Sequence, residues 1–368
     1  MHAVASVEYR QEMKGFCAMT LFKKKDLVGI DIGSSSMKLV QLKETRIGYE
    51  LVNIGMAPLP VEAIVDNTLM DTSAIVEALR TLTKSLNIRV NQAACSISGN
   101  SVIIRNIRFP YLTADELEEQ INWEAEQYIP FDINDVNIDF HILGPDEIDP
   151  KKMKVILVAS KKELIKEYVS LFKDAGVSLT VLDVDAFALQ NAFELNYEPS
   201  ADEVIALANI GDATMNFNII KNGSSLFTRD IQLGGGLYTR EIQKKHSVTR
   251  DEAEKLKLSE GLLDDEFLRM GIEQCNDTLA MELYRSMDFY GVNATEEKAT
   301  KLYISGGCSS TPLLLDAIRD RLDIPVEIID PFRKIICREK RFTPAYLQEI
   351  APHVTVAMGL AMRRYGDK

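Results

Sequence analysis

The chain has 368 residues, 46% of them hydrophobic and 26% charged, and its 42 basic and 55 acidic residues give a formal net charge of −13. This length accommodates two domains, and the acidic balance argues against non-specific nucleic-acid binding, which needs a positive surface in place of phosphate counterions. No run of about 18 apolar residues predicts a membrane span, and the five scattered cysteines, without CxxC spacing, favour a reduced cytoplasmic compartment and no metal framework.

The first 18 residues lack the plan of a signal peptide, because acidic and polar residues interrupt any apolar stretch. We expect residues 1–24 to form an N-terminal arm without fixed structure, unless Met19 is the true initiator. Three lysines, Lys23–Lys25, lie at and just after the end of this arm, and three charges alone make a poor lipid anchor. The next elements predicted are strands Val28–Ile32, Met37–Leu42 and Tyr49–Gly55, amphipathic helix Thr72–Leu86 and strand Ala93–Ser98.

The segment 103–142 differs from what surrounds it. A capping box that begins at Thr113 opens a helix predicted to run through Tyr128, with Pro130 ending it. We expect the apolar residues of this helix to build a small core, or else to line a groove for a partner; they are Leu117, Ile121, Trp123 and Tyr128. The elements predicted to follow are strands Val136–Ile142 and Lys154–Ala159, helix Lys162–Ala175 and strand Ser178–Asp183.

The second half repeats the order of the first. Its predicted strands are Val204–Ala208, Asn216–Ile220, Ser225–Ile231, Leu302–Ser305 and Val326–Ile329. Its predicted helices are two or three within Gly236–Tyr290, one at Pro312–Arg321 and a buried one at Val354–Arg364. The fold class that follows is mixed α/β with a duplicated core.

One short stretch occurs twice. Residues 31–43 (DIGSSSMKLVQLK) align without gaps on residues 209–221 (NIGDATMNFNIIK), and each copy joins two strand-like runs. The offset of 178 residues is nearly half of the chain, which indicates two related halves rather than a short tandem array. Two such strand–turn–strand units would grip one anionic ligand between them.

The turn of the first copy has the chemistry of a phosphate loop. Gly33 permits a tight turn, the serines after it offer hydroxyl and amide donors, and Lys38 adds positive charge. Asp31 stands where its carboxylate would hold a water of a Mg²⁺ shell. Ordinary turn chemistry is the alternative for one hairpin alone. The candidate binding residues are Asp31, Gly33, Ser34, Ser35, Ser36 and Lys38.

The second copy and two later motifs complete the candidate site. The Gly306–Gly307 pair after a predicted strand would let the backbone approach a flat ring such as adenine, with a small-residue turn as the alternative. The glycines 234–236 form either a flexible joint or a helix N-terminus that faces an anion. Glu254 and Lys257 stand three residues apart on one predicted helix, and they form either a solvated ion pair or a contact to the nucleoside. The residues are Asn209, Gly211, Asp212, Thr214, Glu254, Lys257, Gly306 and Gly307.

In this order the motifs resemble the nucleotide site of the actin–Hsp70–sugar kinase superfamily. Within it, the chain from about Leu21 onward is similar to the PilM family, actin-like cytoplasmic proteins of type IV pilus assembly and relatives of the cell-division protein FtsA. The segments that carry this resemblance are Leu21–Gly33, Trp123–Phe131, Asp183–Asn191 and Phe227–Asp230.

The resemblance implies a duplicated actin/Hsp70-like (ribonuclease H-like) core with an FtsA-type small subdomain. The implied boundaries are 25–102 and 150–195 for the first lobe, 103–149 for the inserted subdomain and 196–368 for the second lobe. Asp183 and Asp185 would lie in the first connecting segment between lobes, and Ala357–Ala361 in the second.

The resemblance also implies ATP and Mg²⁺ as cofactors. Asp31, Gly33 and the three serines would be the first phosphate loop, with Mg²⁺ reached from Asp31 through water. Asn209, Gly211 and Thr214 would be the second loop, and Glu254, Lys257, Gly306 and Gly307 would frame the nucleoside. Asn209 departs from the pattern, because hydrolytic members commonly carry Asp there, and this affects turnover more than binding.

The leading interpretation is an ATP-binding adaptor, with at most weak hydrolysis, at the inner face of the inner membrane. The resemblance implies that it docks the N-terminal cytoplasmic peptide of a PilN-like inner-membrane protein beside the small subdomain, and acts with other pilus proteins in twitching motility. The alternatives are an FtsA-like filament-forming or membrane-tethered protein and a sugar-kinase-type phosphotransferase. The last needs a general base, for which only Asp183, Asp185 and Asp212 offer themselves. The oligomeric state is left open.

Overall fold

The computed structural model describes residues 27–146, 148–257, 259, 262–293 and 297–367. The chain forms two compact units. Unit 1 comprises Met1–Tyr197, Pro331–Thr343 and Val356–Lys368, and unit 2 comprises Glu198–Asp330 and Pro344–Thr355. The expected N-terminal arm, residues 1–24, lies outside the described residues.

Unit 1 is built on a five-stranded sheet with the order β10-β6-β1-β2-β3. Strand β1 pairs antiparallel with β2 and parallel with β6. The strands are β1 (Val28–Ile32), β2 (Ser36–Thr45), β3 (Gly48–Pro58), β6 (Gln92–Ile97) and β10 (Ser178–Val184), and a separate ribbon joins β4 (Ile64–Val65) and β5 (Thr68–Leu69). The helices are α1 (Thr72–Ser85), α3 (Lys162–Asp174), α4 (Asp185–Tyr197) and α10 (Thr355–Ala361).

Alternate residues of this sheet pack on opposite layers, as the pleat of a strand requires. Ala93 and Cys95 of β6 belong to the main core of unit 1, which the apolar faces of α1 and α3 complete. Ala94, between them, packs instead with residues of α4 and α10. Helix α1 begins where predicted, because the Asp71 carboxylate accepts a hydrogen bond from the Ala74 amide at 2.9 Å.

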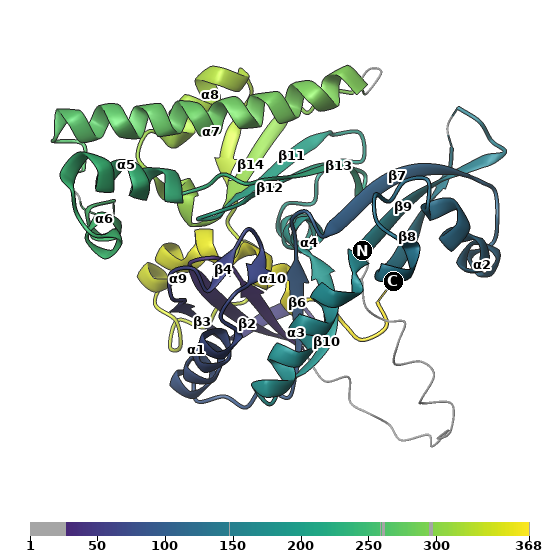
Figure 1. Ribbon diagram of the computed structural model, residues 1–368, viewed down its shortest axis with the longest axis horizontal. Coiled ribbons are helices and arrows are strands. Elements are labelled where there is room, and N and C mark those ends of the chain that lie inside the picture. Colours follow the sequence, from purple (N-terminus) through teal and green to yellow (C-terminus); the bar gives the residue numbers. More distant parts are fainter. Residues whose placement is uncertain (1–26, 147, 258, 260–261, 294–296, 368) are drawn as a thin grey trace. The chain divides into compact units, whose positions relative to one another are not determined.

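Unit 2 has a second five-stranded sheet, with the order β13-β12-β11-β14-β15. Its strands are β11 (Ile205–Ile210), β12 (Met215–Lys221), β13 (Ser224–Ile231), β14 (Lys301–Ser305) and β15 (Val326–Ile328). Its helices are α5 (Gly236–His246), α6 (Arg250–Lys257), α7 (Glu266–Asn293), η3 (Gly307–Ser310), α8 (Leu314–Leu322), α9 (Pro344–Ile350) and η4 (Ala351–His353). The long helix α7 is green in Figure 1.

The strand pairing shows that the two sheets are copies of one another. In unit 1, Asp31 lies opposite Lys38 and Ile32 opposite Met37. In unit 2, Asn209 lies opposite Asn216 and Ile210 opposite Met215, so the register is the same after the shift of 178 residues. In each unit the central strand also pairs with a parallel strand that comes later in the chain. The duplication predicted from the short repeat is therefore confirmed.

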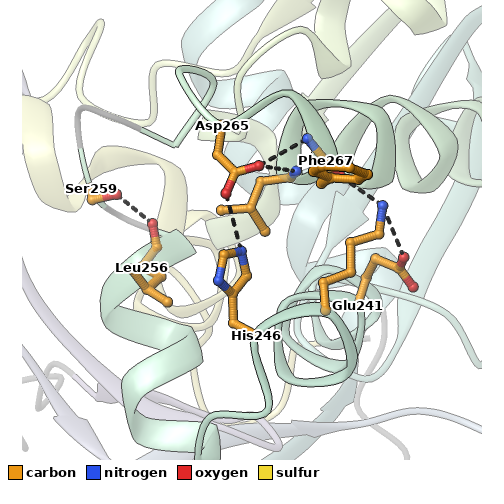
Figure 2. Close-up of polar contacts among 8 residues, drawn as sticks. Glu241, His246, Leu256, Ser259, Asp265 and Phe267 are labelled. Atoms are coloured by element: carbon orange, nitrogen blue, oxygen red, sulfur yellow. Dashed lines mark hydrogen bonds and ion pairs between the residues drawn. The ribbon is translucent and has the colours of Figure 1, made fainter.

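Figure 2 shows how the helices of unit 2 are tied together at the start of α7. The Asp265 carboxylate accepts hydrogen bonds from the amides of Phe267 and Leu268, at 2.8 and 3.1 Å, and its other oxygen lies 3.5 Å from Nε2 of His246 at the end of α5. Lys245 of α5 donates to the Phe267 carbonyl at 2.6 Å. One carboxylate thus caps α7 and joins it to α5.

A small subdomain within unit 1 consists of a three-stranded antiparallel sheet, ordered β7-β9-β8, and helix α2. The elements are β7 (Val102–Pro110), α2 (Ala114–Ala125), η2 (Ile133–Asp135), β8 (Val136–Pro145) and β9 (Lys152–Lys161). The capping box predicted at Thr113 is present: its hydroxyl accepts from the Glu116 amide and the Glu116 carboxylate accepts from the Thr113 amide.

The expectation that four apolar residues of the predicted helix form the subdomain core is half wrong, and α2 ends at Ala125, three residues short of Tyr128. Leu117 and Ile121 are buried, but Trp123 is 81% exposed and Tyr128 38% exposed. The buried positions of α2 fall every fourth residue, at 117, 121 and 125, and a residue two positions from Ile121 points away from that stripe. Trp123 is therefore a surface residue.

The C-terminal part of the chain is shared between the units, whereas the sequence had led us to expect it wholly in the second lobe. Residues 331–343 are held to unit 1 by Asn196 of α4, whose amide donates to the Pro331 carbonyl at 3.1 Å and accepts from the Lys334 amide at 2.9 Å. They also cover the β3 edge, where the Leu51 amide donates to the Ile336 carbonyl at 3.0 Å. These contacts join residues far apart in sequence, so local pattern does not predict them.

The last helix, α10, is buried as predicted, and it ends at Ala361, short of the expected Arg364. Two glycines let it pack at backbone distance. A Cβ on Gly29 of β1 would lie 2.2 Å from the Ala357 carbonyl oxygen, and a Cβ on Gly359 would lie 1.8 Å from that of Ala188. After the helix, Nε of Arg363 lies 3.1 Å from the buried Asp183 carboxylate.

Among the described residues, no helix combines the length and apolarity needed to cross a bilayer.

Candidate nucleotide-binding loops

The first candidate loop is the β1–β2 turn of unit 1. The Gly33 amide donates to the Ser36 carbonyl at 3.1 Å and closes the turn. Lys38 Nζ lies 3.4 Å from Oδ2 of Asp31 and 3.3 Å from the Ser36 carbonyl, and a Cβ on Gly33 would approach that ammonium to 3.1 Å. The carboxylate thus holds the lysine charge at the mouth of the turn, beside the glycine.

The charges of this loop are largely shielded from solvent, because the side chains of Lys38 and Asp31 are only 13% and 15% exposed. Ser34 and Ser36 are half-buried, and Ser35 is exposed with its carbonyl bonded to the Leu59 amide at 2.9 Å. The arrangement offers an anion one fixed cation and several hydroxyl groups. All six first-half residues singled out from the sequence lie in this one turn and its flanking strands.

The second candidate loop is the β11–β12 turn of unit 2, and it closes in the same way. The Gly211 amide donates to the Thr214 carbonyl at 2.9 Å. Its charge arrangement differs, since the acid lies within the turn: Oδ2 of Asp212 is 2.9 Å from a guanidinium nitrogen of Arg250, the first residue of α6. Arg250 was not expected from the sequence, although it precedes Glu254 by four residues, one helical turn.

Asn209 belongs to a row of polar side chains that crosses four neighbouring strands. Its amide donates to Oδ1 of Asn216 at 3.3 Å, and its carbonyl oxygen accepts from the Ser305 hydroxyl at 3.1 Å. Asn216 in turn donates to Asp230 at 2.8 Å. Both ends of the Asn209 side chain are therefore engaged by neutral partners, where unit 1 has the ion pair of Asp31 and Lys38.

The glycine run 234–236 is explained by packing against the second loop. The amides of Gly235 and Gly236 donate to the carbonyls of Gly211 and Asp212, each at 2.8 Å, and a Cβ on Gly234 would lie 2.4 Å from the Gly211 carbonyl oxygen. These two amides at the start of α5 are thus bonded to the loop itself. The sequence had suggested either a flexible joint or a helix N-terminus that faces an anion. The contacts match neither, because the run is tightly packed and these two amides are already bonded.

The Gly306–Gly307 pair is likewise required by contacts within unit 2. Gly306 has φ 89°, and a Cβ on it would lie 2.3 Å from the Ile210 carbonyl oxygen. A Cβ on Gly307 would lie 2.6 Å from Cε1 of His353, so the flat ring that already approaches this glycine is an imidazole. His353 was missed from the sequence, because it lies 46 residues further on, in the short helix η4.

Glu254 and Lys257 form an ion pair at 2.6 Å, and both contact Thr239 of α5. Burial raises the pKa of the Cys308 thiol, directly after the glycine pair, to about 12. The charge of Lys257 lowers this pKa and that of Asp212 raises it, so both charges act on this thiol. Unit 2 thus brings the second loop, the α6 pair and Gly306–Gly307 around one place. The eight residues singled out from the sequence for the second half lie in these elements of unit 2.

The comparison with known proteins decides the family. A model of the family described as type IV pilus assembly protein PilM matches residues 29–365. The chain belongs to this family.

The similarity to solved structures agrees with the PilM assignment. One chain of a structure described as the PilM-PilN type IV pilus biogenesis complex is 27% identical, covers 93% of this chain and 99% of its own length, and gives a TM-score of 0.83. More distant matches are the ethanolamine utilization protein EutJ from Carboxydothermus hydrogenoformans (14% identity, 93% and 91% covered, TM-score 0.54) and MreB 5 of Spiroplasma citri bound to AMPPNP (12%, 92% and 95%, 0.50). The duplicated actin-like core predicted from the sequence is confirmed.

Proposed function

We propose that this member of the PilM family is an ATP-binding adaptor of type IV pilus assembly that docks the cytoplasmic peptide of a PilN-like inner-membrane protein. The observation that carries the proposal is the match to the PilM-PilN complex over 93% of the chain, within a family match to residues 29–365. The adaptor would work at the inner face of the inner membrane, where its partner holds it.

The two loops support nucleotide binding. Lys38 and the serines of the first loop would bind phosphate oxygens, and the Glu254–Lys257 pair with the Gly306–Gly307 backbone would frame the nucleoside. Among the described residues, no group of three or more His, Cys, Asp or Glu side chains would hold a metal by itself. Mg²⁺ suits such a site, because it commonly keeps several waters and binds through one carboxylate and substrate phosphates; Asp31 would supply that carboxylate.

Weak turnover follows from the second loop. Efficient hydrolysis needs charge neutralisation and a positioned water at the terminal phosphate. Asn209 supplies no negative charge, and its amide group is bonded to Asn216 and Ser305. We therefore propose that ATP acts mainly as a conformational ligand, which shifts the protein between states only through its different affinities for them.

A hollow in unit 1 offers a place for the peptide. It has a volume of about 1030 Å³ and lies between the η2 turn of the small subdomain and the first turns of α3. Lys161 lies over the Phe131 ring at 4.7 Å on one side of it. The lining combines lysines and carboxylates with one aromatic ring, that of Phe131, which suits a peptide with both apolar and polar side chains. The lining residues are Phe131, Asp132, Asn134, Asp135, Lys161, Lys162, Glu163, Lys166, Glu167 and Ser170.

The test is calorimetric titration of the full chain with a synthetic peptide of the N-terminal cytoplasmic residues of the PilN-like protein from the same organism. We expect Lys166→Ala, in the hollow, to weaken binding at least about fivefold, as for loss of a charged hydrogen bond. Lys173→Ala is the control, because Lys173 is exposed on the same helix but does not line the hollow. Equal affinities of the two variants would contradict the hollow as the site, and failure of the unaltered chain to bind would contradict the adaptor function.

A further inference from the structure

The two outer strands of the small subdomain's sheet present different edges. In the order β7-β9-β8, each outer strand is paired with β9 alone among the strands that the structure describes (Figure 1). The β7 edge carries Arg105, Asn106 and Arg108, all exposed, and ends at Pro110. Charged side chains and proline are the usual means by which proteins keep an edge from pairing with another chain.

Strand β8 also carries polar side chains, at Asn137, Asp139 and His141, and ends at Pro145, but they alternate with an apolar row. From Val136 to Ile142 the pairing with β9 is without a bulge, and the register shifts only between Ile142 and Gly144. The side chains of Ile138, Phe140 and Ile142 pack against the subdomain core but remain partly exposed. A regular edge with one apolar face can accept a further strand.

One hydrogen bond shows which backbone groups of β8 point outward. The Phe140 amide donates to the Asp139 carboxylate at 2.9 Å, so it is directed away from β9. In an antiparallel ladder the direction of the backbone groups alternates with each residue. The amides and carbonyls of Ile138 and Ile142 therefore face the same outer edge as those of Phe140.

The hollow borders the start of β8. Strand β8 starts at Val136, directly after Asp135, which lines the hollow, and the ladder partner of Val136 is Lys161, which lines it too. A chain that lies in the hollow in extended form would reach the outer edge of β8 by passing the start of that strand. Its backbone would then replace the Asp139 carboxylate as the partner of the Phe140 amide.

We propose that the peptide docked in the hollow continues along β8 as a fourth strand of the small subdomain's sheet. This inference rests on the proposed function and adds the mode of recognition: main-chain hydrogen bonds to Ile138, Phe140 and Ile142, with alternate apolar side chains of the peptide over those three residues. The chemistry requires an extended apolar segment, not a helix, in the partner.

Backbone N-methylation of the peptide tests the mode directly. Two versions of the synthetic peptide carry the same number of N-methyl groups, one set at odd positions and the other at even positions, and each is titrated into the full chain. Strand pairing predicts that one version loses at least about tenfold in affinity, since it loses several hydrogen bonds at once, while the other stays within about threefold. Equal affinities of the two versions, high or low, overturn strand pairing. No binding of the unmodified peptide instead contradicts the proposed function.

A pair of variants tests the same edge on the protein. Phe140→Pro removes an amide that does not bond to β9, whereas Phe140→Val shortens the same side chain and keeps the amide. We expect the proline variant to bind the unmodified peptide at least about tenfold more weakly than the valine variant. Equal binding by two folded variants overturns the inference, and if the proline variant does not fold, the N-methylated peptides decide alone.

Discussion

The close packing of α10 predicts that an alanine at Gly359 lowers the free energy of unfolding, whereas an alanine at Gly291 of α7 raises it. An alanine Cβ at Gly359 would lie 1.8 Å from the Ala188 carbonyl oxygen and 2.6 Å from its carbon. These are backbone atoms of α4, so no change of rotamer relieves the overlap. An alanine at Gly291 of α7 would meet no heavy atom within 4 Å.

The magnitudes follow from two opposing effects. Replacing a helical glycine by alanine gains about 0.8–1 kcal/mol of intrinsic helix propensity at either position. At Gly359 the overlap costs about 3 kcal/mol or more, at or beyond the upper end for overpacked sites, because backbone has to move. We therefore expect Gly359→Ala to lower the free energy of unfolding by about 2 kcal/mol, and Gly291→Ala to raise it by up to about 1 kcal/mol.

Urea unfolding followed by far-ultraviolet circular dichroism measures both changes. Tryptophan fluorescence would be a poor probe, since the single tryptophan, Trp123, is 81% exposed on the small subdomain. A Gly359→Ala protein as stable as the unaltered chain would refute the reasoning, because α10 and α4 would then not lie at backbone distance.

Three further predictions concern buried polar groups and a helix cap. Asn196→Ala should cost about 2 kcal/mol by removing the hydrogen bonds to the buried Pro331 carbonyl and to the Lys334 amide, and hydrogen exchange should speed up in residues 331–343. Burial raises the pKa of Asp183 to about 6 and outweighs the opposing effect of Arg363. The folded state therefore keeps a proton on Asp183 that the unfolded chain loses near pH 4. The free energy of unfolding should fall by up to about 3 kcal/mol between pH 4 and pH 7, and this fall should vanish in Asp183→Asn. Asp265→Ala should cost about 1 kcal/mol as a lost helix cap, with faster exchange confined to the first turn of α7.

Local pattern predicted those parts of the fold that local physics determines. The hairpins of both sheets and the capping box at Thr113 follow from alternation, turn residues and caps, and all are present. The helix α4 was not predicted as a helix, because eight of its thirteen residues are buried and no polar stripe marks its period. Helix α9 and strand β7 were likewise not predicted, the first being only seven residues long and the second lying in a segment of mixed character.

The candidate loops show the same division. Residue types and spacing were enough to place Asp31, Gly33 and Lys38 in one turn and its flanking strands. The reason for the glycines 234–236 and for Gly306–Gly307 was not predictable, since their close contacts are with Gly211, Ile210 and His353, which are distant in sequence. The exposure of Trp123 depended on which side of α2 meets the sheet, and the apolar pattern alone did not fix that.

The central claim is an adaptor whose peptide affinity responds to nucleotide. Titration of the full chain with the cytoplasmic peptide of the PilN-like protein, in the presence and in the absence of Mg-ATP, tests it most directly. The account predicts micromolar binding with an affinity that changes at least severalfold when Mg-ATP is added. The same affinity in both conditions would contradict the coupling, and no binding in either would contradict the adaptor itself.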